Sequence, residues 1–239
     1  MDPLYLTIDI DWAPDFMIQG MADVLVEYGM RATWFVTHDT PLLGDLSAEP
    51  LFELGIHPNI AASSTQGGDE REIFGRLMEL VPDAVCVRTH GNVQSTNLTI
   101  RMSRDYKMRV DASYFLPREP VKPHYVRWVE TEILRVPYDW EDAYEASQSD
   151  SEWSLDEGHL AKPGMHVINF HPVHWYLNTQ DYRTYARAKD LGPVQAWTPG
   201  LIADLIAAGQ GPREFLTRLS IDGATRSRKL CDLLVTSGV

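Results

Sequence analysis

Two spacings of apolar positions alternate along the chain, and they predict alternating strands and helices. Short apolar runs rich in β-branched and aromatic residues are typical of strands, whereas apolar residues three and four positions apart are typical of helices. The short runs predict strands over residues 4–9, 32–37, 56–57, 85–90, 110–115, 133–137 and 166–171. Helical spacing predicts a turn over residues 50–54 and helices over residues 15–28, 69–80, 97–107, 182–189, 199–208, 213–219 and 226–236.

Repeated strand–helix units predict the fold class, which is α/β with a mostly parallel sheet. About seven strands with no linker between them favour a closed or incompletely closed barrel over an open sheet. The 239 residues suit a single domain over residues 1–239, and an apolar content of 44% is enough for a complete core. We expect the polar stretch over residues 141–160 to be a long loop.

Charge and composition exclude several classes of protein. The chain has 34 acidic and 21 basic residues and a net charge of −13, so we expect neither nucleic acid nor an anionic membrane as a partner. We find no basic leader followed by an apolar run and no stretch of about 18 apolar residues, and therefore expect no signal peptide, no membrane span and a cytoplasmic location. Cys86 and Cys231 form no CxxC motif, which favours a reducing compartment.

Ionisable residues stand at the ends of several predicted strands. In a parallel barrel these ends meet at one rim, where functional residues gather. The first strand leads into Asp9 and Asp11, whose side chains share a face because strand side chains alternate. Neighbouring carboxylates repel each other unless a cation or a proton lies between them, or one of them acts as a base. The pair therefore indicates a cation site or an acid–base site.

Two later strand ends supply groups that would complete such a site. Asp11, His57 and His90 offer one carboxylate and two imidazoles, which is the ligand set of a catalytic zinc site with a fourth position for water. Asp9 could accept a proton from that water, and Arg88 could keep Asp9 ionised. We expect one divalent cation as the cofactor, with zinc as the default and manganese, cobalt, nickel or iron as alternatives.

Another strand end carries a candidate acid. His171 could donate a proton to a leaving nitrogen, and Asp142 could hold its imidazole in the required tautomer. His174 lies three residues further on and could compete for this role or contact a substrate.

Five motifs in order, over residues 4 to about 178, resemble those of the polysaccharide deacetylase family (carbohydrate esterase family four). "TIDIDW" resembles the first motif, in which the first aspartate is the catalytic base and the last binds the metal, here Asp9 and Asp11. "ELGIHPN" resembles the second motif, with His57 as a metal ligand, and "VRTHGN" resembles the third, with Arg88 bracing the base.

The last two motifs extend the resemblance to the other half of the site. "VPYDWEDA" resembles the fourth motif and implies an aromatic groove wall at Trp140 beside Asp142, and "INFHP" resembles the fifth, with the general acid at His171. The family implies a distorted (β/α)7 barrel and metal-dependent removal of acetyl from an N-acetylated sugar. Asn59 and Asn178 flank the site and could hydrogen-bond sugar hydroxyls.

Three further strings narrow the resemblance to one branch of the family. "HPN", "RTH" and "FHPVHWYLNT" together resemble a cytoplasmic branch associated with the synthesis of bacterial surface polysaccharides such as O-antigen. This branch implies a precursor, such as a nucleotide sugar or a lipid-linked saccharide, as the substrate.

The chain departs from the family at one position and leaves two other functions open. The second motif normally has another histidine four residues after the first, and here that position is Ala61. Either His90 replaces that ligand or the metal site is incomplete, which would suit a non-catalytic sugar-binding relative. A glycosyltransferase also binds manganese and a nucleotide through Asp-x-Asp, although that motif usually lies in the middle of a chain.

Overall fold

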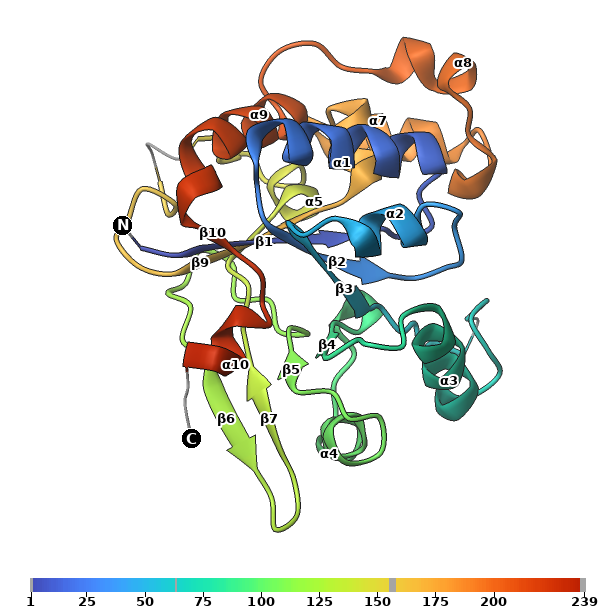
Figure 1. The fold of residues 1–239 in the computed structure, drawn as a ribbon. Coiled ribbons are helices and arrows are strands. Elements are labelled where there is room, and N and C mark those ends of the chain that lie inside the picture. Colours follow the sequence, from blue (N-terminus) through green and yellow to red (C-terminus); the bar gives the residue numbers. More distant parts are fainter. Residues whose placement is uncertain (1, 63, 155–157, 237–239) are drawn as a thin grey trace.

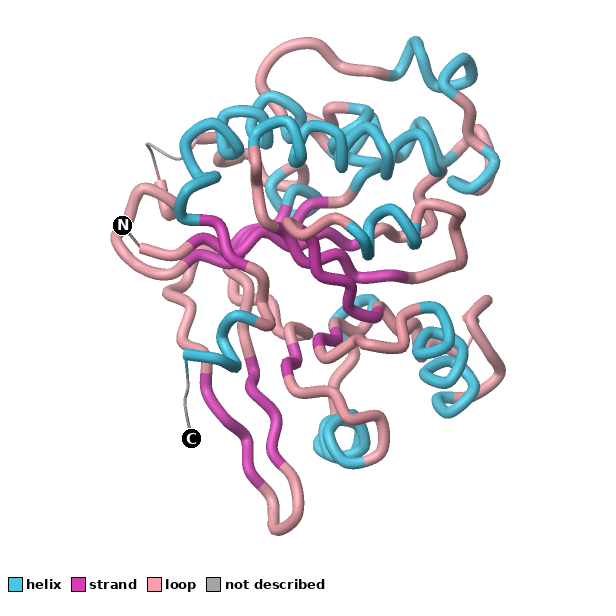
Figure 2. The backbone as a smooth tube through the Cα atoms, in the orientation of Figure 1, coloured by secondary structure: helices cyan, strands magenta, loops and turns pink. Residues whose placement is uncertain are grey.

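A computed structural model describes all residues except 1, 63, 155–157 and 237–239. Over the described residues, ten strands form one sheet with α-helices on its outer side (Figures 1 and 2). The strands are β1 (Leu4–Asp9), β2 (Ala32–Val36), β3 (Phe52–Ile56), β4 (Cys86–Val87), β5 (Val110–Asp111), β6 (His124–Arg127), β7 (Glu132–Arg135), β8 (Trp140–Glu141), β9 (His166–Phe170) and β10 (Ser227–Arg228). The helices are α1 (Asp15–Tyr28), α2 (Leu43–Ala48), α3 (Glu70–Leu80), α4 (Thr96–Arg104), α5 (Asp142–Glu145), α6 (Pro172–Leu177), α7 (Tyr182–Lys189), α8 (Pro199–Ile202), α9 (Pro212–Gly223) and α10 (Asp232–Thr236). Within the part of the chain that is described, we find no helix with the length and apolar character needed to cross a bilayer.

The parallel strands follow one another around a ring. Strands β1 to β5 pair successively in parallel, and β9 pairs with the other side of β1. Residues 132–141 begin as β7 beside β5 and end as β8 beside β9. Between these two strands, the amide of Tyr138 donates to the carbonyl of Tyr114, and the amide of Asp139 donates to the carbonyl of Val167. Counting β7 and β8 as one bent strand, seven parallel positions result, which confirms the expected distorted (β/α)7 barrel.

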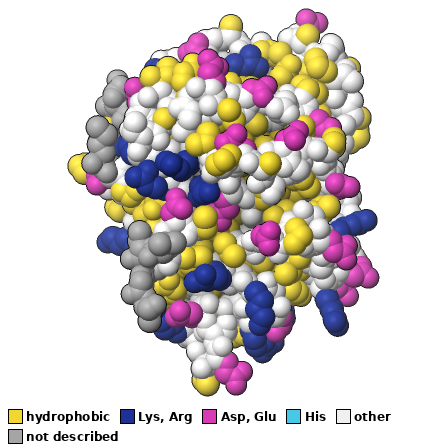
Figure 3. All heavy atoms as spheres, in the orientation of Figure 1, with side chains coloured by type: hydrophobic (Ala, Val, Ile, Leu, Met, Phe, Trp, Pro, Cys, Tyr) yellow, Lys and Arg dark blue, Asp and Glu magenta, His cyan; other side chains and the backbone are white. Residues whose placement is uncertain are grey.

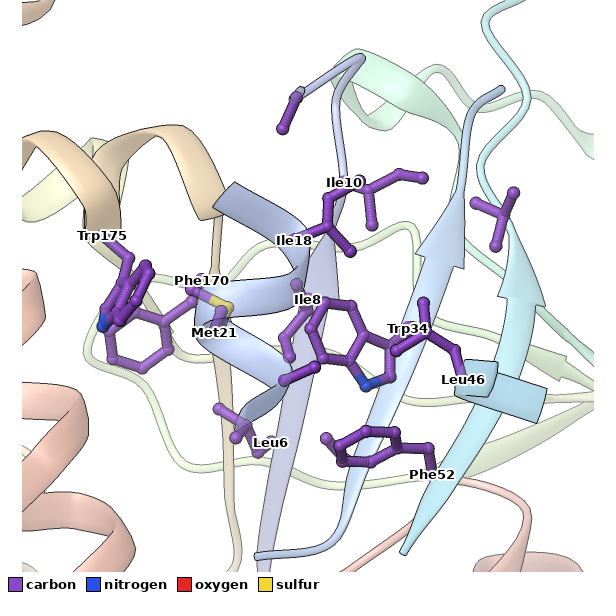
Figure 4. Packing of buried hydrophobic residues seen from close by; sticks show 14 of the residues in the cluster. Leu6, Ile8, Ile10, Ile18, Met21, Trp34, Leu46, Phe52, Phe170 and Trp175 are labelled. Atoms are coloured by element: carbon purple, nitrogen blue, oxygen red, sulfur yellow. The ribbon is translucent and has the colours of Figure 1, made fainter. Parts of the chain in front are cut away.

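Alternating side chains of the central strand pack on two sides of the sheet. Leu6 and Ile8 of β1 point outward to α1, where Met21 covers them (Figure 4). Tyr5 belongs to a second buried cluster with residues of β5 and β9. Every residue of β1 is buried, and burying a large apolar side chain contributes about 1.5–3 kcal/mol. The strand that ends at Asp9 is therefore held from both faces.

Sequence and structure differ where pairing between distant segments overrides local preference. The predicted turn over residues 50–54 is wrong, because β3 starts at Phe52 and pairs along its whole length with β2. The predicted helix over residues 226–236 is wrong in its first part, because Ser227 and Arg228 pair with the start of β1 as β10. The pattern also missed α2 and β6, which pairs with β7 in an antiparallel hairpin that projects from the body in Figure 1. The expected loop over residues 141–160 contains α5, and residues 155–157 lie outside the described part.

Candidate active site

A cavity of about 270 Å³ lies at the carboxyl ends of the parallel strands. Figure 3 colours histidine cyan, and no histidine is visible on the face that it shows. The ionisable lining residues of the cavity come from five rim positions of the barrel and from α7. They are Asp9, Asp11, His57, Arg88, His90, Tyr138, Glu141, His171, His174, Tyr182, Tyr185 and Lys189.

Three side chains from different strand ends form a nearly equilateral triangle of ligand atoms. Asp11 Oδ1 lies 3.2 Å from His57 Nε2 and 3.3 Å from His90 Nδ1, and the two nitrogens are 3.3 Å apart. Ligand atoms bound at about 2.0–2.1 Å to a tetrahedral zinc ion are about 3.3–3.4 Å apart. Asp11 Oδ1 is also buried without a well-aligned hydrogen bond to any described residue. The donor set and its spacing therefore fit a divalent cation.

Local backbone features bring the triangle together. Gly55 of β3 has no side chain, and a Cβ atom there would lie 2.7 Å from the Cys86 carbonyl oxygen of β4. Glycine thus permits the close approach of the two strands that lead to His57 and His90. Asp11 has a φ of 38°, in the left-handed region that is unfavourable for a residue with a side chain. This turn after β1 directs the carboxylate to the two histidines.

The base predicted at Asp9 is held in a buried polar network. Arg88 Nη1 donates to Asp9 Oδ1 at 3.0 Å, and Asn169 Nδ2 donates to Asp9 Oδ2 at 3.0 Å. Arg88 Nη1 also donates to Thr7 Oγ1, and Arg88 Nε donates to the Ala112 carbonyl oxygen. Arg88 is 1% exposed, so its charge has little contact with water.

The charges around Asp9 keep it ionised. Burial alone would raise its pKa, but Arg88, His57 and His171 oppose this effect, and the pKa lies below its usual value. Burial would likewise raise the pKa of Asp11, but its close contacts with His57 and His90 bring that pKa well below its usual value. Both carboxylates therefore stay charged at neutral pH, as a base and a cation ligand require.

His171 faces the two aspartates from the other side of the cavity. Asp142 Oδ1 lies 2.7 Å from His171 Nδ1, and Asp142 Oδ2 accepts the backbone amide of His171 at 2.8 Å. Burial would lower the pKa of His171, but the neighbouring carboxylates, with Asp142 foremost, raise it well above its usual value. A protonated imidazole thus points its Nε2 into the cavity, 3.9 Å from Asp9 Oδ2 and 3.8 Å from Asp11 Oδ2.

Several lining residues were not identified from the sequence, among them Glu141 and three residues of α7. Glu141 follows Trp140 in β8, and the only available signal was an acidic residue at a strand end. Tyr182, Tyr185 and Lys189 come from α7, where spacings of three and four residues place them on one helix face. His174, the predicted competitor of His171, also lines the cavity, and burial lowers its pKa to about 4.

Three predicted substrate contacts lie elsewhere. Trp140 is fully buried against Phe170 and Phe215, so the prediction of a groove wall there is corrected to a core position. Asn178 ends α6 in the left-handed conformation and is likewise corrected, because its amide donates to the carbonyls of residues 207 and 209. Asn59 does not line the cavity, and its side chain accepts the backbone amide of Ala61.

A second group of two histidines and an aspartate lies outside this cavity. Asp139 Oδ2 is 2.6 Å from both His159 Nε2 and His166 Nδ1, and all three residues are buried. These distances are those of hydrogen bonds and are shorter than the separation of ligand atoms around a zinc ion. The group therefore acts as a buried hydrogen-bonded link between Asp139, which precedes β8, and His166, the first residue of β9.

The barrel and its rim cavity define an α/β-barrel protein of the polysaccharide deacetylase type. The family model for WbmS-like polysaccharide deacetylases matches residues 6–189, and the chain belongs to this family. Its roles for individual residues stay predictions, although the structure brings Asp9, Arg88, His171 and the proposed ligands into one cavity.

WbmS and a xylanase domain are two of the solved structures that are similar to the chain. WbmS from Bordetella bronchiseptica, assigned as a polysaccharide deacetylase involved in O-antigen biosynthesis, is 34% identical, with a TM-score of 0.81 over 92% of this chain and 90% of that one. The Xyl-CE4 domain of a multidomain xylanase from the hindgut metagenome of Trinervitermes trinervoides is 13% identical, with a TM-score of 0.47 over 100% of this chain and 93% of that one. The comparison with curated proteins found no match.

Proposed function

We propose that this protein is a metal-dependent deacetylase that hydrolyses the acetamide group of an N-acetylated sugar. One observation carries the proposal: a triangle of possible cation ligands shares a small cavity with a buried carboxylate and an oriented imidazole. A sugar-binding protein without catalysis would need neither the ionised Asp9 nor the protonated His171. His90 Nδ1 lies 3.3 Å from Asp11 Oδ1, and this contact supports the proposal that His90 replaces the family ligand that is absent at Ala61.

The residues of this chain divide the reaction between them. A divalent cation, held by Asp11, His57 and His90, would supply Lewis-acid activation of water and of the amide carbonyl. Asp9 accepts a proton from the attacking water, and the adjacent guanidinium keeps the carboxylate ionised and oriented. His171 gives its Nε2 proton to the departing nitrogen. The products are acetate and a free amino sugar.

The family branch suggests the class of substrate. WbmS, which shares the fold over most of both chains, is assigned to O-antigen biosynthesis. We therefore propose a role in bacterial surface-polysaccharide synthesis, on a precursor such as a nucleotide sugar or a lipid-linked saccharide. Zinc is the metal we propose first, because imidazole and carboxylate ligands suit it.

Elemental analysis and acetate release together test this function. Protein purified without a histidine tag should hold about one metal ion per chain, and His90→Ala should lose it. His124→Ala, which changes an exposed histidine on β6, is the matched control and should keep the metal. Asp9→Asn should also keep the metal but release acetate about 10²- to 10⁴-fold more slowly from N-acetylated sugars.

The proposal also has a result that would refute it. Wild-type protein that takes up none of zinc, manganese, cobalt, nickel or iron after reconstitution would be no metal-dependent enzyme. Binding of N-acetylated sugars without acetate release would then favour the sugar-binding alternative.

A further inference from the structure

Glu141 occupies a place in the cavity that the proposed reaction does not yet use. It is the second residue of β8, and its neighbour Trp140 packs in the outer core against Phe170. Successive strand side chains point to opposite faces, so Glu141 projects to the inner side, where it lines the cavity. Its side chain has 18% relative exposure, which leaves it mostly enclosed yet reachable from the cavity.

The carboxylate of Glu141 lies near His171 Nε2, the atom that carries the proton to be delivered to the leaving nitrogen. Glu141 Oε1 lies 3.7 Å from His171 Nε2, which is too long for a direct hydrogen bond. An atom that accepts a hydrogen bond from His171 Nε2 at about 2.8 Å can therefore also lie about 3 Å from Glu141 Oε1. His171 Nε2 and Glu141 Oε1 therefore flank one position in the cavity, where a single ligand atom can contact both.

Glu141 differs from the two aspartates in having no hydrogen bond from a cationic group of the described residues, and the nearest such group is His171 at 3.7 Å. Asp9 is bonded to Arg88 and Asn169, and Asp11 lies against two histidines. Glu141 Oε2 accepts only a long hydrogen bond of 3.4 Å from the Tyr138 hydroxyl, and Oε1 makes none with a described residue.

The charges facing Glu141 explain its protonation behaviour. Burial, with the nearby carboxylates of Asp142 and Asp9, outweighs the opposing charges of His171 and Arg88 and raises its pKa to about 7. A carboxylate in this state gains from any ligand that brings positive charge or an N–H donor.

We propose that Glu141 is a further catalytic residue, which accepts a hydrogen bond from the sugar nitrogen as that nitrogen leaves. The inference rests on the proposed N-deacetylation. The nitrogen of an acetamide is planar and has one N–H. When water attacks the carbonyl carbon, this nitrogen becomes pyramidal, takes the proton from His171 and gains positive charge before its bond to carbon breaks. Glu141 Oε1 stabilises that charge through the N–H, an interaction stronger in the transition state than in the substrate.

An ester provides the chemical control, because its leaving oxygen carries no hydrogen and therefore cannot donate a hydrogen bond to Glu141. We would measure kcat and KM of wild type and Glu141→Gln on UDP-N-acetylglucosamine and tetra-N-acetylchitotetraose by acetate release, and on 4-nitrophenyl acetate by absorbance. Glutamine keeps the size of the side chain but not its charge. Glu132→Gln, an exposed change on β7, is the matched control.

We expect Glu141→Gln to keep its metal and to lose about 10- to 100-fold in kcat on the amides, which is the contribution typical of a hydrogen bond to a charged group. Its kcat on the ester should stay within about threefold of wild type. An equal loss on amide and ester would overturn the proposal, because it would indicate a general structural effect. Unchanged turnover of the amides would overturn it as well.

Binding of the amine product separates this inference from the proposed function. Wild type that releases no acetate from any N-acetylated probe refutes the proposed function on these probes, and binding of glucosamine then decides the role of Glu141. We expect glucosamine, as its ammonium form, to bind wild type at least about tenfold more tightly than Glu141→Gln. Equal affinity, or no affinity in either protein, would overturn the role of Glu141.

Discussion

Replacing Arg88 by methionine would test how the barrel keeps a buried base charged. Arg88 is 1% exposed and Asp9 is 3% exposed, and they are joined by a hydrogen bond of 3.0 Å. The guanidinium lies 4.6 Å from the ring centre of Phe35 and 4.2 Å from that of Tyr138. Methionine fills much of this space without a charge, so the change removes the ion pair with limited loss of packing.

The structure sets the expected size of the effect. Removing one partner of a buried ion pair costs about 3–5 kcal/mol, because the other charge remains buried and unpaired. Asn169 Nδ2 still donates to Asp9 Oδ2 at 3.0 Å, so we expect a loss near 3 kcal/mol at pH 7. This is a large part of the about 5–15 kcal/mol by which folded proteins are typically stable.

The loss should depend on pH in a defined direction. In wild type the pKa of Asp9 lies below its unfolded value, so its contribution to stability is present above that value and is lost as pH falls through the folded pKa. In Arg88→Met, burial raises the pKa of Asp9, and protonation relieves the unpaired charge as pH falls. The difference in stability between the two proteins should therefore shrink towards acid pH.

Urea unfolding of chelator-treated protein, followed by tryptophan fluorescence between about pH 5 and 8, measures this difference. The double variant Asp9→Asn with Arg88→Met should be about 2 kcal/mol more stable than Arg88→Met alone, since it removes the stranded charge. A double variant no more stable than the single one would refute this reasoning and assign the role of Arg88 to packing.

Three further predictions concern residues outside the cavity. Asn178→Ala should lower the free energy of unfolding by about 2–4 kcal/mol in urea titrations and leave KM unchanged. The change removes the acceptor of the Arg213 amide, two hydrogen bonds donated by the Asn178 side chain and a residue suited to the left-handed region. A raised KM at unchanged stability would contradict this prediction. Trp140→Ala should cost about 3–5 kcal/mol through the cavity it leaves, and a small loss of stability with a large rise in KM would restore the groove-wall reading. Burial would lower the pKa of His166, but the hydrogen bond with Asp139 and further contacts raise it above its usual value. His166 should therefore contribute stability that is full below about pH 6.5 and is lost as pH rises through the folded pKa. His166→Gln should abolish that part of the pH dependence of unfolding, and an unaltered profile would show that another group causes it.

Local sequence determined which side chains reach the rim of the barrel. Asp9 and Asp11 follow a strand whose apolar, β-branched pattern is unambiguous, and Arg88 and His171 also come at the ends of short apolar runs. Parallel strands place their carboxyl ends at one edge, so the order of these runs was enough to predict a shared site. The barrel class followed from the same alternation.

Tertiary structure alone decided which way residues 138–141 face. Tyr138 and Trp140 are two positions apart, so regular alternation predicts that they share a face. In the structure Tyr138 lies in the buried cluster that contains Tyr5, whereas Trp140 lies in the cluster that contains Leu6 and Ile8. The two side chains differ because the chain bends at Asp139, where its neighbouring strand changes from β5 to β9. That bend turns Glu141 into the cavity.

The same division holds for the cation site and for the strand pairs that the pattern missed. The sequence proposed Asp11, His57 and His90 as ligands, but their spacing of 3.2–3.3 Å depends on the order β1–β2–β3–β4 in the curved sheet, which brings the ends of β1, β3 and β4 to one cavity. β10 forms only because its two residues meet the start of β1 across more than 200 positions of chain. A strand of two residues carries no periodic pattern, and its hydrogen-bond partners exist only after the barrel has closed. The sequence therefore determines the apolar runs that become the main strands, whereas the closed barrel determines which strands pair and how far apart the ligand atoms lie.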